Sequence, residues 1–179
     1  KVKLTSDISH LSDNEKQMLN YLYEVGNIMD DIFWTQQFGS DKETFLNSIQ
    51  DPDARLFAEI NYGPWNHFDG LAPFLPEYGE MPAGAGFYPA DMTKEEFEAW
   101  DNPDKTSLYT LVRRDENGKL QTVWYHEAYA EQIQKAAKLL EEASKLASDK
   151  EFAEYLSLRA KALLTDDYFE SDMAWMDVR

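Results

Sequence analysis

The sequence predicts a mainly helical domain of the α+β class, with one β-hairpin and a long ordered loop. Apolar residues recur at helical spacing over several long segments, and two short β-type runs flank an Asn-Gly pair. Residues 62–92 hold five of the seven prolines and five of the eight glycines. Because 179 residues leave room for one core, we expect a single domain over residues 1–179.

Three helices are predicted to open the chain. Ser12 and Glu15 form a capping box before a helix that Gly39 ends. Its apolar stripe consists of Met18, Leu22, Val25, Met29, Ile32 and Phe33. Two shorter helices are expected over residues 42–49 and 52–60, the second with Pro52 in its first turn.

Residues 62–92 predict a loop in which regular structure is not expected, because prolines and glycines interrupt it throughout. The same segment contains many aromatic residues: Tyr62, Trp65, Phe68, Phe74, Tyr78, Phe87 and Tyr88. A mobile linker would not carry so many aromatic rings. We therefore expect an ordered loop that lies on the helices, a kind of loop that is often functional.

The second half of the chain predicts a short helix, a hairpin and then helices. Thr93 and Glu96 make a second capping box, and residues 108–112 and 120–125 form strands around the Asn117-Gly118 turn. A long helix is expected from about residue 127 to residue 147. A further helix should be capped by Ser148 and Glu151, and a final helical turn should cover residues 171–175.

Arg159 falls inside the apolar stripe of the helix that follows Ser148. An unpaired guanidinium there would cost several kcal/mol or more. We therefore predict a structural ion pair between Arg159 and one of Asp166, Asp167 and Asp172. We also expect at least one of these acids to cap the next helix or to bind the arginine.

The chain is strongly acidic, with 17 Lys plus Arg against 34 Asp plus Glu, a net charge of −17 and a pI near 4.4. This charge disfavours nucleic acid as a partner and favours a basic or amine-bearing ligand. There is no cysteine, so disulfides and thiolate chemistry are excluded. No apolar run predicts a transmembrane segment, and the compartment stays open between cytoplasm and bacterial periplasm or export.

No catalytic or metal-binding motif is recognisable. His10, His67 and His126 lack the spacing of metal ligands, and a structural or surface role is expected for each. The Gly84 and Gly86 pair lacks the pattern of a phosphate-binding loop. The acidic pairs at residues 30–31 and 166–167 fit solvated or capping roles better than acid–base chemistry. We therefore predict no catalytic residue and no metal ligand in this chain.

The remaining candidate site lies in residues 61–70. We predict that Asn61, Tyr62, Trp65 and Asp69 bind a peptide, with the amide holding its backbone and a carboxylate its α-amine. Residues 62–92 contain no Lys or Arg, which suits a cationic group. The alternative interpretation is that Tyr62, Trp65 and Phe68 fill the core and Asp69 caps a turn.

Several blocks of the sequence carry a resemblance to a known family: NYGPW at 61–65, GFYPADM at 86–92, SLYT at 107–110, YLSLRA at 155–160, TDDY at 165–168 and SDMAWMD at 171–177. The chain resembles the amino-terminal region of bacterial dipeptidyl peptidase III-like zinc metallopeptidases. Some proteins of this kind are labelled Nudix or MutT, but the Nudix box G-x5-E-x7-R-E-x2-E-E is absent from the sequence.

The resemblance implies a fragment, the non-catalytic amino-terminal lobe of a two-lobed peptidase, forming one wall of a peptide-binding cleft. It implies as partners a carboxyl-terminal catalytic lobe of the same chain and a short peptide substrate. Zinc would be held by an H-E-x-x-x-H helix and a downstream glutamate outside these residues. Two alternatives stay open: a stand-alone module that uses the aromatic loop for a carbohydrate or protein ligand, and a hydrolase that works with its acidic pairs alone.

Overall fold

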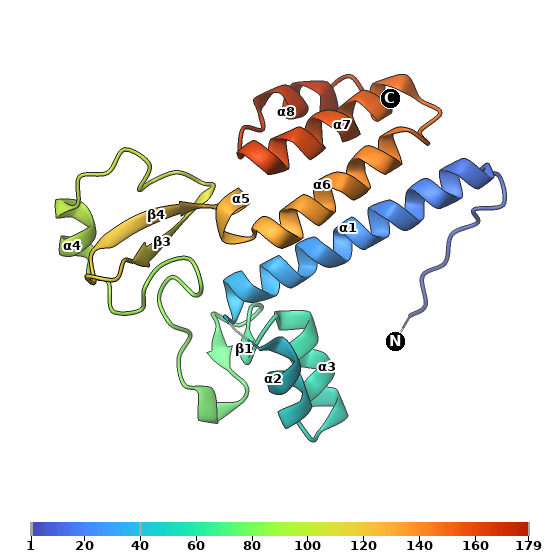
Figure 1. The fold of residues 1–179 in the computed structure, drawn as a ribbon. Coiled ribbons are helices and arrows are strands. Elements are labelled where there is room, and N and C mark those ends of the chain that lie inside the picture. Colours follow the sequence, from blue (N-terminus) through green and yellow to red (C-terminus); the bar gives the residue numbers. More distant parts are fainter. Residues whose placement is uncertain (1, 40, 179) are drawn as a thin grey trace. The chain divides into compact units, whose positions relative to one another are not determined.

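A computed structural model describes residues 2–39 and 41–178 and shows a mainly helical chain with two small antiparallel strand pairs (Figure 1). The predicted fold class is confirmed. The chain divides into two compact units, one formed by Lys1–Met29 with Tyr125–Arg179 and the other by Asp30–Trp124. None of the helices in the described ranges is long and apolar enough to cross a membrane.

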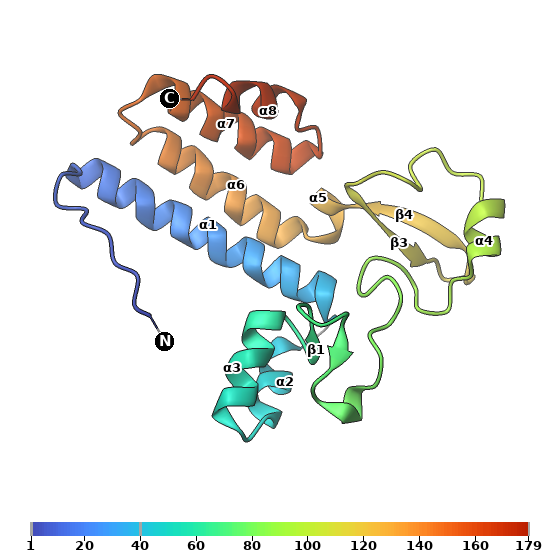
Figure 2. The same ribbon diagram turned by 180° about the vertical axis from the view of Figure 1, so that it is seen from behind.

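The first unit is helical. It contains the first part of α1 (Asp13–Gln37) and then α5 (Tyr125–Ala128), α6 (Ala130–Ser144), α7 (Lys150–Thr165) and α8 (Phe169–Trp175). Helices α6 and α7 pack side by side, and α8 packs on α7 (Figures 1 and 2). Small residues line the α6–α7 contact and allow a close approach of the two helices; the buried residues of this pair include Ala136, Ala143 and Ala160 with Leu140, Leu156 and Leu163.

The capping residues at the ends of these helices agree only in part with those predicted from the sequence. The first capping box is confirmed, because Glu15 N–H donates to Ser12 Oγ at 3.2 Å and Ser12 N–H donates to Glu15 Oε2 at 2.8 Å. The predicted cap of α7 is wrong by one residue. Asp149, not Ser148, accepts from Phe152 N–H at 2.7 Å, since an ionised carboxylate is the stronger acceptor, and Ser148 Oγ instead donates to Glu15 Oε1.

Two other boundaries differ from expectation. The helix expected from residue 127 is broken at Tyr129, whose φ of −119° and ψ of 32° lie outside the helical region, so that α5 and α6 are separate. Helix α8 begins at Phe169 rather than at Ser171; its N-cap is Tyr168, and the Asp167 carboxylate just before it accepts from Phe169 N–H at 3.2 Å.

The second unit contains the end of α1 and two short helices, α2 (Lys42–Ser48) and α3 (Pro52–Asn61), as predicted. The loop holds some regular structure, contrary to expectation: β1 (Trp65–Asn66), β2 (Ala72–Pro73) and the 3-10 helix η1 (Pro76–Tyr78). Strands of two residues are too short to leave a hydrophobic period in the sequence. The core comprises Trp34, Phe45, Leu46 and Ala58, with Phe38, Ile49, Tyr62, Phe74 and Leu75 packed against it.

The predicted hairpin is confirmed as β3 (Thr110–Arg114) and β4 (Leu120–Trp124), which pair antiparallel with Arg114 opposite Leu120. Gly118 adopts a φ of 78° in the turn, a conformation that glycine reaches without strain. Helix α4 (Lys94–Ala99) lies beside the hairpin (Figure 2). The loop is ordered here because it is held on both sides: Gly86 N–H donates to Gln36 O at 2.7 Å, and Val112 N–H donates to Phe87 O at 2.9 Å.

Candidate functional site

Asn61 is the most buried of the four predicted binding residues, with 1% of its surface exposed. Its side-chain amide donates to Phe57 O at 2.9 Å, and its Oδ1 accepts from His67 N–H at 2.9 Å. The first bond lies within α3, and the second ties the end of α3 to the residue that follows β1. Asn61 therefore sets the position of the loop, and its amide atoms are engaged within the unit.

Tyr62 ends α3 in the left-handed region, with φ 53° and ψ 38°. Its ring packs against Phe33 and Trp34 at centroid distances of 4.7 and 5.2 Å. Its hydroxyl donates to Asp30 Oδ1 at 2.6 Å, and Lys42 Nζ lies 3.3 Å from the other oxygen of that carboxylate. The hydrogen bond to Asp30, with burial, raises the pKa of Tyr62, so this hydroxyl stays protonated at neutral pH.

Trp65 is buried in β1, with 5% of its surface exposed. Its indole N–H donates to Gly79 O at 3.0 Å, which joins β1 to the segment after η1. The ring packs near Phe38. The packing of Tyr62 and Trp65 agrees with the alternative interpretation, in which these two residues fill the core.

Phe68 and Asp69 differ from the other residues of the candidate site, because both are exposed at the tip of the β1–β2 turn. Phe68 has 82% of its surface exposed and therefore does not fill the core. The turn itself is held by backbone bonds: Asp69 N–H and Leu71 N–H both donate to Asn66 O. The Asp69 carboxylate makes no hydrogen bond or ion pair with any of the described residues. This turn presents an aromatic ring and a carboxylate to solvent on a rigid base.

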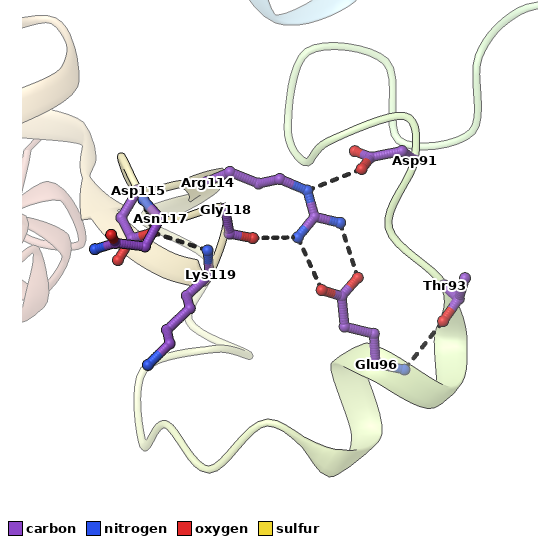
Figure 3. A network of polar contacts seen from close by, with 8 residues as sticks. All are labelled: Asp91, Thr93, Glu96, Arg114, Asp115, Asn117, Gly118 and Lys119. Carbon is purple, nitrogen blue, oxygen red and sulfur yellow. Dashed lines mark hydrogen bonds and ion pairs between the residues drawn. The ribbon is translucent and has the colours of Figure 1, made fainter.

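Arg114 of β3 ties the loop and α4 to the hairpin (Figure 3). Its guanidinium binds the Glu96 carboxylate at 2.8 and 2.9 Å, the Asp91 carboxylate at 2.9 Å and Gly118 O at 2.8 Å. Hydrogen bonding to Arg114 lowers the pKa of Glu96. The second capping box is thus realised on one side only: Glu96 N–H donates to Thr93 Oγ1, while the Glu96 carboxylate binds Arg114.

In the first unit, Arg159 pairs with Asp172, with Nη2 2.7 Å from Oδ1. Its guanidinium also lies over the Tyr155 and Tyr168 rings, 5.3 Å from each centroid. The other two acids of the predicted set do not pair with it. Asp167 accepts from Phe169 N–H at the start of α8, and Asp166 binds His126.

Asp166 and His126 form a pair that the sequence analysis did not predict. The Asp166 side chain is 1% exposed, and its Oδ2 accepts from His126 N–H at 3.0 Å and lies 2.7 Å from His126 Nδ1. The only sequence signal was the presence of both residue types. The two residues lie 40 positions apart, and no repeating pattern in the sequence indicates that they are in contact.

The described residues contain no group of three or more His, Cys, Asp or Glu side chains placed to hold a metal ion. The donor set of residues 2–39 and 41–178 therefore does not fit a zinc site. The acidic pairs meet the expectation of solvated or capping roles only in part. Asp31 and Asp167 are exposed, and Asp31 pairs with Lys42. Asp166, by contrast, is buried and bound to His126.

No family model matches the chain. Among curated proteins it is 27% identical over 238 residues to Nudix hydrolase 3 of Arabidopsis thaliana, an alignment that covers 99% of this chain and 31% of that protein. Among solved structures it matches dipeptidyl peptidase III from Caldithrix abyssi at 37% identity and a TM-score of 0.86, covering 97% of this chain. Dipeptidyl peptidase III from Corallococcus sp. strain EGB matches at 31% identity and a TM-score of 0.89, covering 99% of this chain.

The chain spans 35% of each of these two structures, about a third of their length. The identities above 30% and these TM-scores show that nearly the whole chain is related to the two structures in sequence and in fold. The resemblance expected from the sequence is confirmed: this chain is similar, in sequence and in fold, to a part of bacterial dipeptidyl peptidase III.

Proposed function

We propose that this chain is the non-catalytic amino-terminal lobe of a longer dipeptidyl peptidase III-like zinc metallopeptidase and forms one wall of its peptide-binding cleft. The observation that carries the proposal is the similarity of nearly the whole chain to two dipeptidyl peptidase III structures. The carboxyl-terminal lobe of the same protein would hold the zinc and be the partner of this lobe, and short peptides would be the substrate. The described residues supply no metal site of their own.

Within this lobe, the β1–β2 turn is the part of the candidate site that a peptide can reach. Asp69 and Phe68 are exposed there, whereas Asn61 and Trp65 are buried. In the proposal the Asp69 carboxylate attracts the peptide's α-amine and the Phe68 ring covers apolar side chains. Asn61, Tyr62 and Trp65 act as positioning residues that hold this turn.

The test is a steady-state comparison in the full-length protein. Asp69→Asn and Phe68→Ala should each raise the KM for a short peptide several-fold, with a smaller effect on kcat, because neither residue touches the reacting bond. Asp53→Asn is the matched control, since it removes the same charge from an exposed position on α3. Unchanged KM values for both turn variants would show that this turn is not the wall of the cleft.

A stand-alone binding module remains the second candidate function, favoured by one observation. Phe68, at 82% exposed, is an aromatic plate on a rigid turn, which is also how carbohydrate and protein ligands are held. A full-length protein that binds peptides or sugars through Phe68 but cleaves no peptide would support this second function.

A further inference from the structure

Arg113 in β3 is a second arginine of the hairpin, and its surroundings differ from those of Arg114. Its Nη1 donates to Val112 O at 2.8 Å and to Phe87 O at 3.2 Å, and its Nη2 donates to Gly86 O at 2.8 Å. All three acceptors are backbone carbonyls. Within residues 2–39 and 41–178, no carboxylate pairs with this guanidinium.

The carbonyl cradle fixes the guanidinium in place. Gly86 and Phe87 are held by hydrogen bonds to Gln36 O and from Val112 N–H, so the acceptors belong to ordered backbone on two sides. A Cβ on Gly86 would lie 2.6 Å from Thr35 O, which shows how closely this segment approaches the end of α1. The arginine is therefore preorganised, and a ligand would not have to order it.

Three of the five guanidinium N–H groups are used by the cradle. The remaining two are the N–H of Nε and one N–H of Nη2, neighbouring donors that match the two oxygens of a carboxylate. Arg113 lines a surface cavity of about 430 Å³ together with Gly86, Tyr88, Pro89 and Arg114. Arg113, with two N–H groups outside the cradle, and Tyr88 thus line the same hollow.

The two arginines of the cavity differ in their partners. Arg114 binds the carboxylates of Asp91 and Glu96, whereas Arg113 binds backbone carbonyls and has no acidic partner in the described part of the chain. Arg113 is therefore the guanidinium of this cavity to which a ligand carboxylate can bind without displacing a carboxylate of the protein.

We infer that Arg113, with Tyr88, forms a binding site for a carboxylate of a short peptide. This inference deepens the proposed function and rests on it, because it takes peptides as the ligand class. The carboxylate can come from the peptide's C-terminus or from an acidic side chain. In both cases the two free N–H groups of Arg113 donate to its oxygens.

The test uses the ¹⁵N-labelled 179-residue chain and the Arg113 Nε–Hε signal in NMR spectra. Three probes separate the sources: tetra-alanine as the free acid, its C-terminal amide, and the amide of Ala-Ala-Glu-Ala. We expect the free acid to shift the Arg113 Nε–Hε signal and the tetra-alanine amide to leave it unchanged. A shift with the glutamate peptide amide would identify side-chain carboxylates as a further source and would also support the site.

Variants give the second readout. Arg113→Gln should weaken the free acid's binding about tenfold, since it removes a charge-assisted pair. Arg113→Lys keeps the charge but loses the paired donors, so it should recover only part of the affinity. Arg55→Gln, the same change on an exposed arginine of α3, should have no effect. If Arg113→Gln does not fold, the NMR comparison of acid and amide on the unmodified chain still decides the question.

Equal binding of the acid and the amide, with the Arg113 signal unmoved, would overturn the carboxylate site and leave the proposed peptide-binding lobe intact. Absence of any shift with all three probes would also overturn the site. The proposed function is judged separately, by cleavage of amide-blocked peptides in the full-length protein, which does not require a carboxylate on the peptide.

Discussion

Asp166 accepts two hydrogen bonds from one residue, His126, through the same oxygen: the backbone N–H at 3.0 Å and ring Nδ1 at 2.7 Å. Because an ionised carboxylate can only accept, ring Nδ1 carries the proton that it donates to Asp166. Asp166 adopts a φ of 55°, a conformation that Asp tolerates better than most residues. The pair joins the end of α7 to the start of α5.

Asp166→Asn tests the strength of this pair. Asparagine keeps the shape and tolerates the same backbone conformation, but it loses the charge, so we expect the free energy of unfolding to fall by about 1–2 kcal/mol. Urea unfolding measures the change. Asp177→Ala, at an exposed site near the end of α8, should change stability by less than about 0.5 kcal/mol. An equal free energy of unfolding for Asp166→Asn and the unmodified protein would show that the ionic character of the pair does not contribute to stability.

Gly86→Ala should destabilise the second unit. The new Cβ would lie 2.6 Å from Thr35 O and 2.9 Å from Gln36 O, both backbone atoms that cannot move independently. We expect a loss of about 1–3 kcal/mol in the free energy of unfolding. Gly26→Ala, where nothing lies within 4 Å of the added Cβ inside α1, should instead stabilise by about 0.5–1 kcal/mol. The opposite signs of the two changes, measured by thermal unfolding, test the packing of the loop against α1.

Tyr62→Phe removes the hydroxyl that donates to Asp30 and keeps the ring that packs on Trp34. We expect the free energy of unfolding to fall by about 1–2 kcal/mol, since the lost bond is to a charged acceptor. The pKa of Tyr62 is raised in the folded state, so its contribution is present below the unfolded-state pKa and is lost as the pH rises through the folded-state pKa. Tyr62→Phe should therefore reduce the alkaline loss of stability. Tyr23→Phe, at an exposed position, is the control.

Glu96→Gln should change how stability depends on acid. The pKa of Glu96 is lowered by hydrogen bonding to Arg114, below its ordinary value of 4.5. Its contribution is therefore present above the unfolded-state pKa and is lost as the pH falls through the folded-state pKa. The Tm of the unmodified protein should drop more between pH 6 and about pH 3 than that of Glu96→Gln. Glu98→Gln, on the same helix but paired only with exposed Lys94, should keep the full acid dependence.

The parts of the fold that the sequence predicted are those with local signals. The capping box at Ser12 and the Asn117-Gly118 turn each fix one element through residues close in the chain, and both elements lie where expected. Ser148 and Glu151 have the spacing of a capping box and therefore predict Ser148 as the cap of α7. In the structure Ser148 binds Glu15, a contact with a distant residue that the sequence does not show, and Asp149 caps the helix.

The candidate site was less predictable, because its key contacts join distant positions. The sequence predicts that Asn61 and Trp65 bind a peptide, but nothing local shows that both are buried and bonded to the loop. Arg113 carries no signal at all in the sequence. Its carbonyl cradle exists only because residues 86 and 87, which are 27 and 26 positions away in the chain, run beside β3.

The central claim is that this chain is the non-catalytic lobe of a peptidase. The most direct measurement is to extend the reading frame past Arg179, express the full-length protein and assay cleavage of a dipeptidyl-naphthylamide with and without a chelator. We predict an H-E-x-x-x-H motif in the added residues and cleavage that the chelator abolishes and zinc restores. A reading frame that ends near Arg179, or a full-length protein with that motif that cleaves no peptide, would contradict the account.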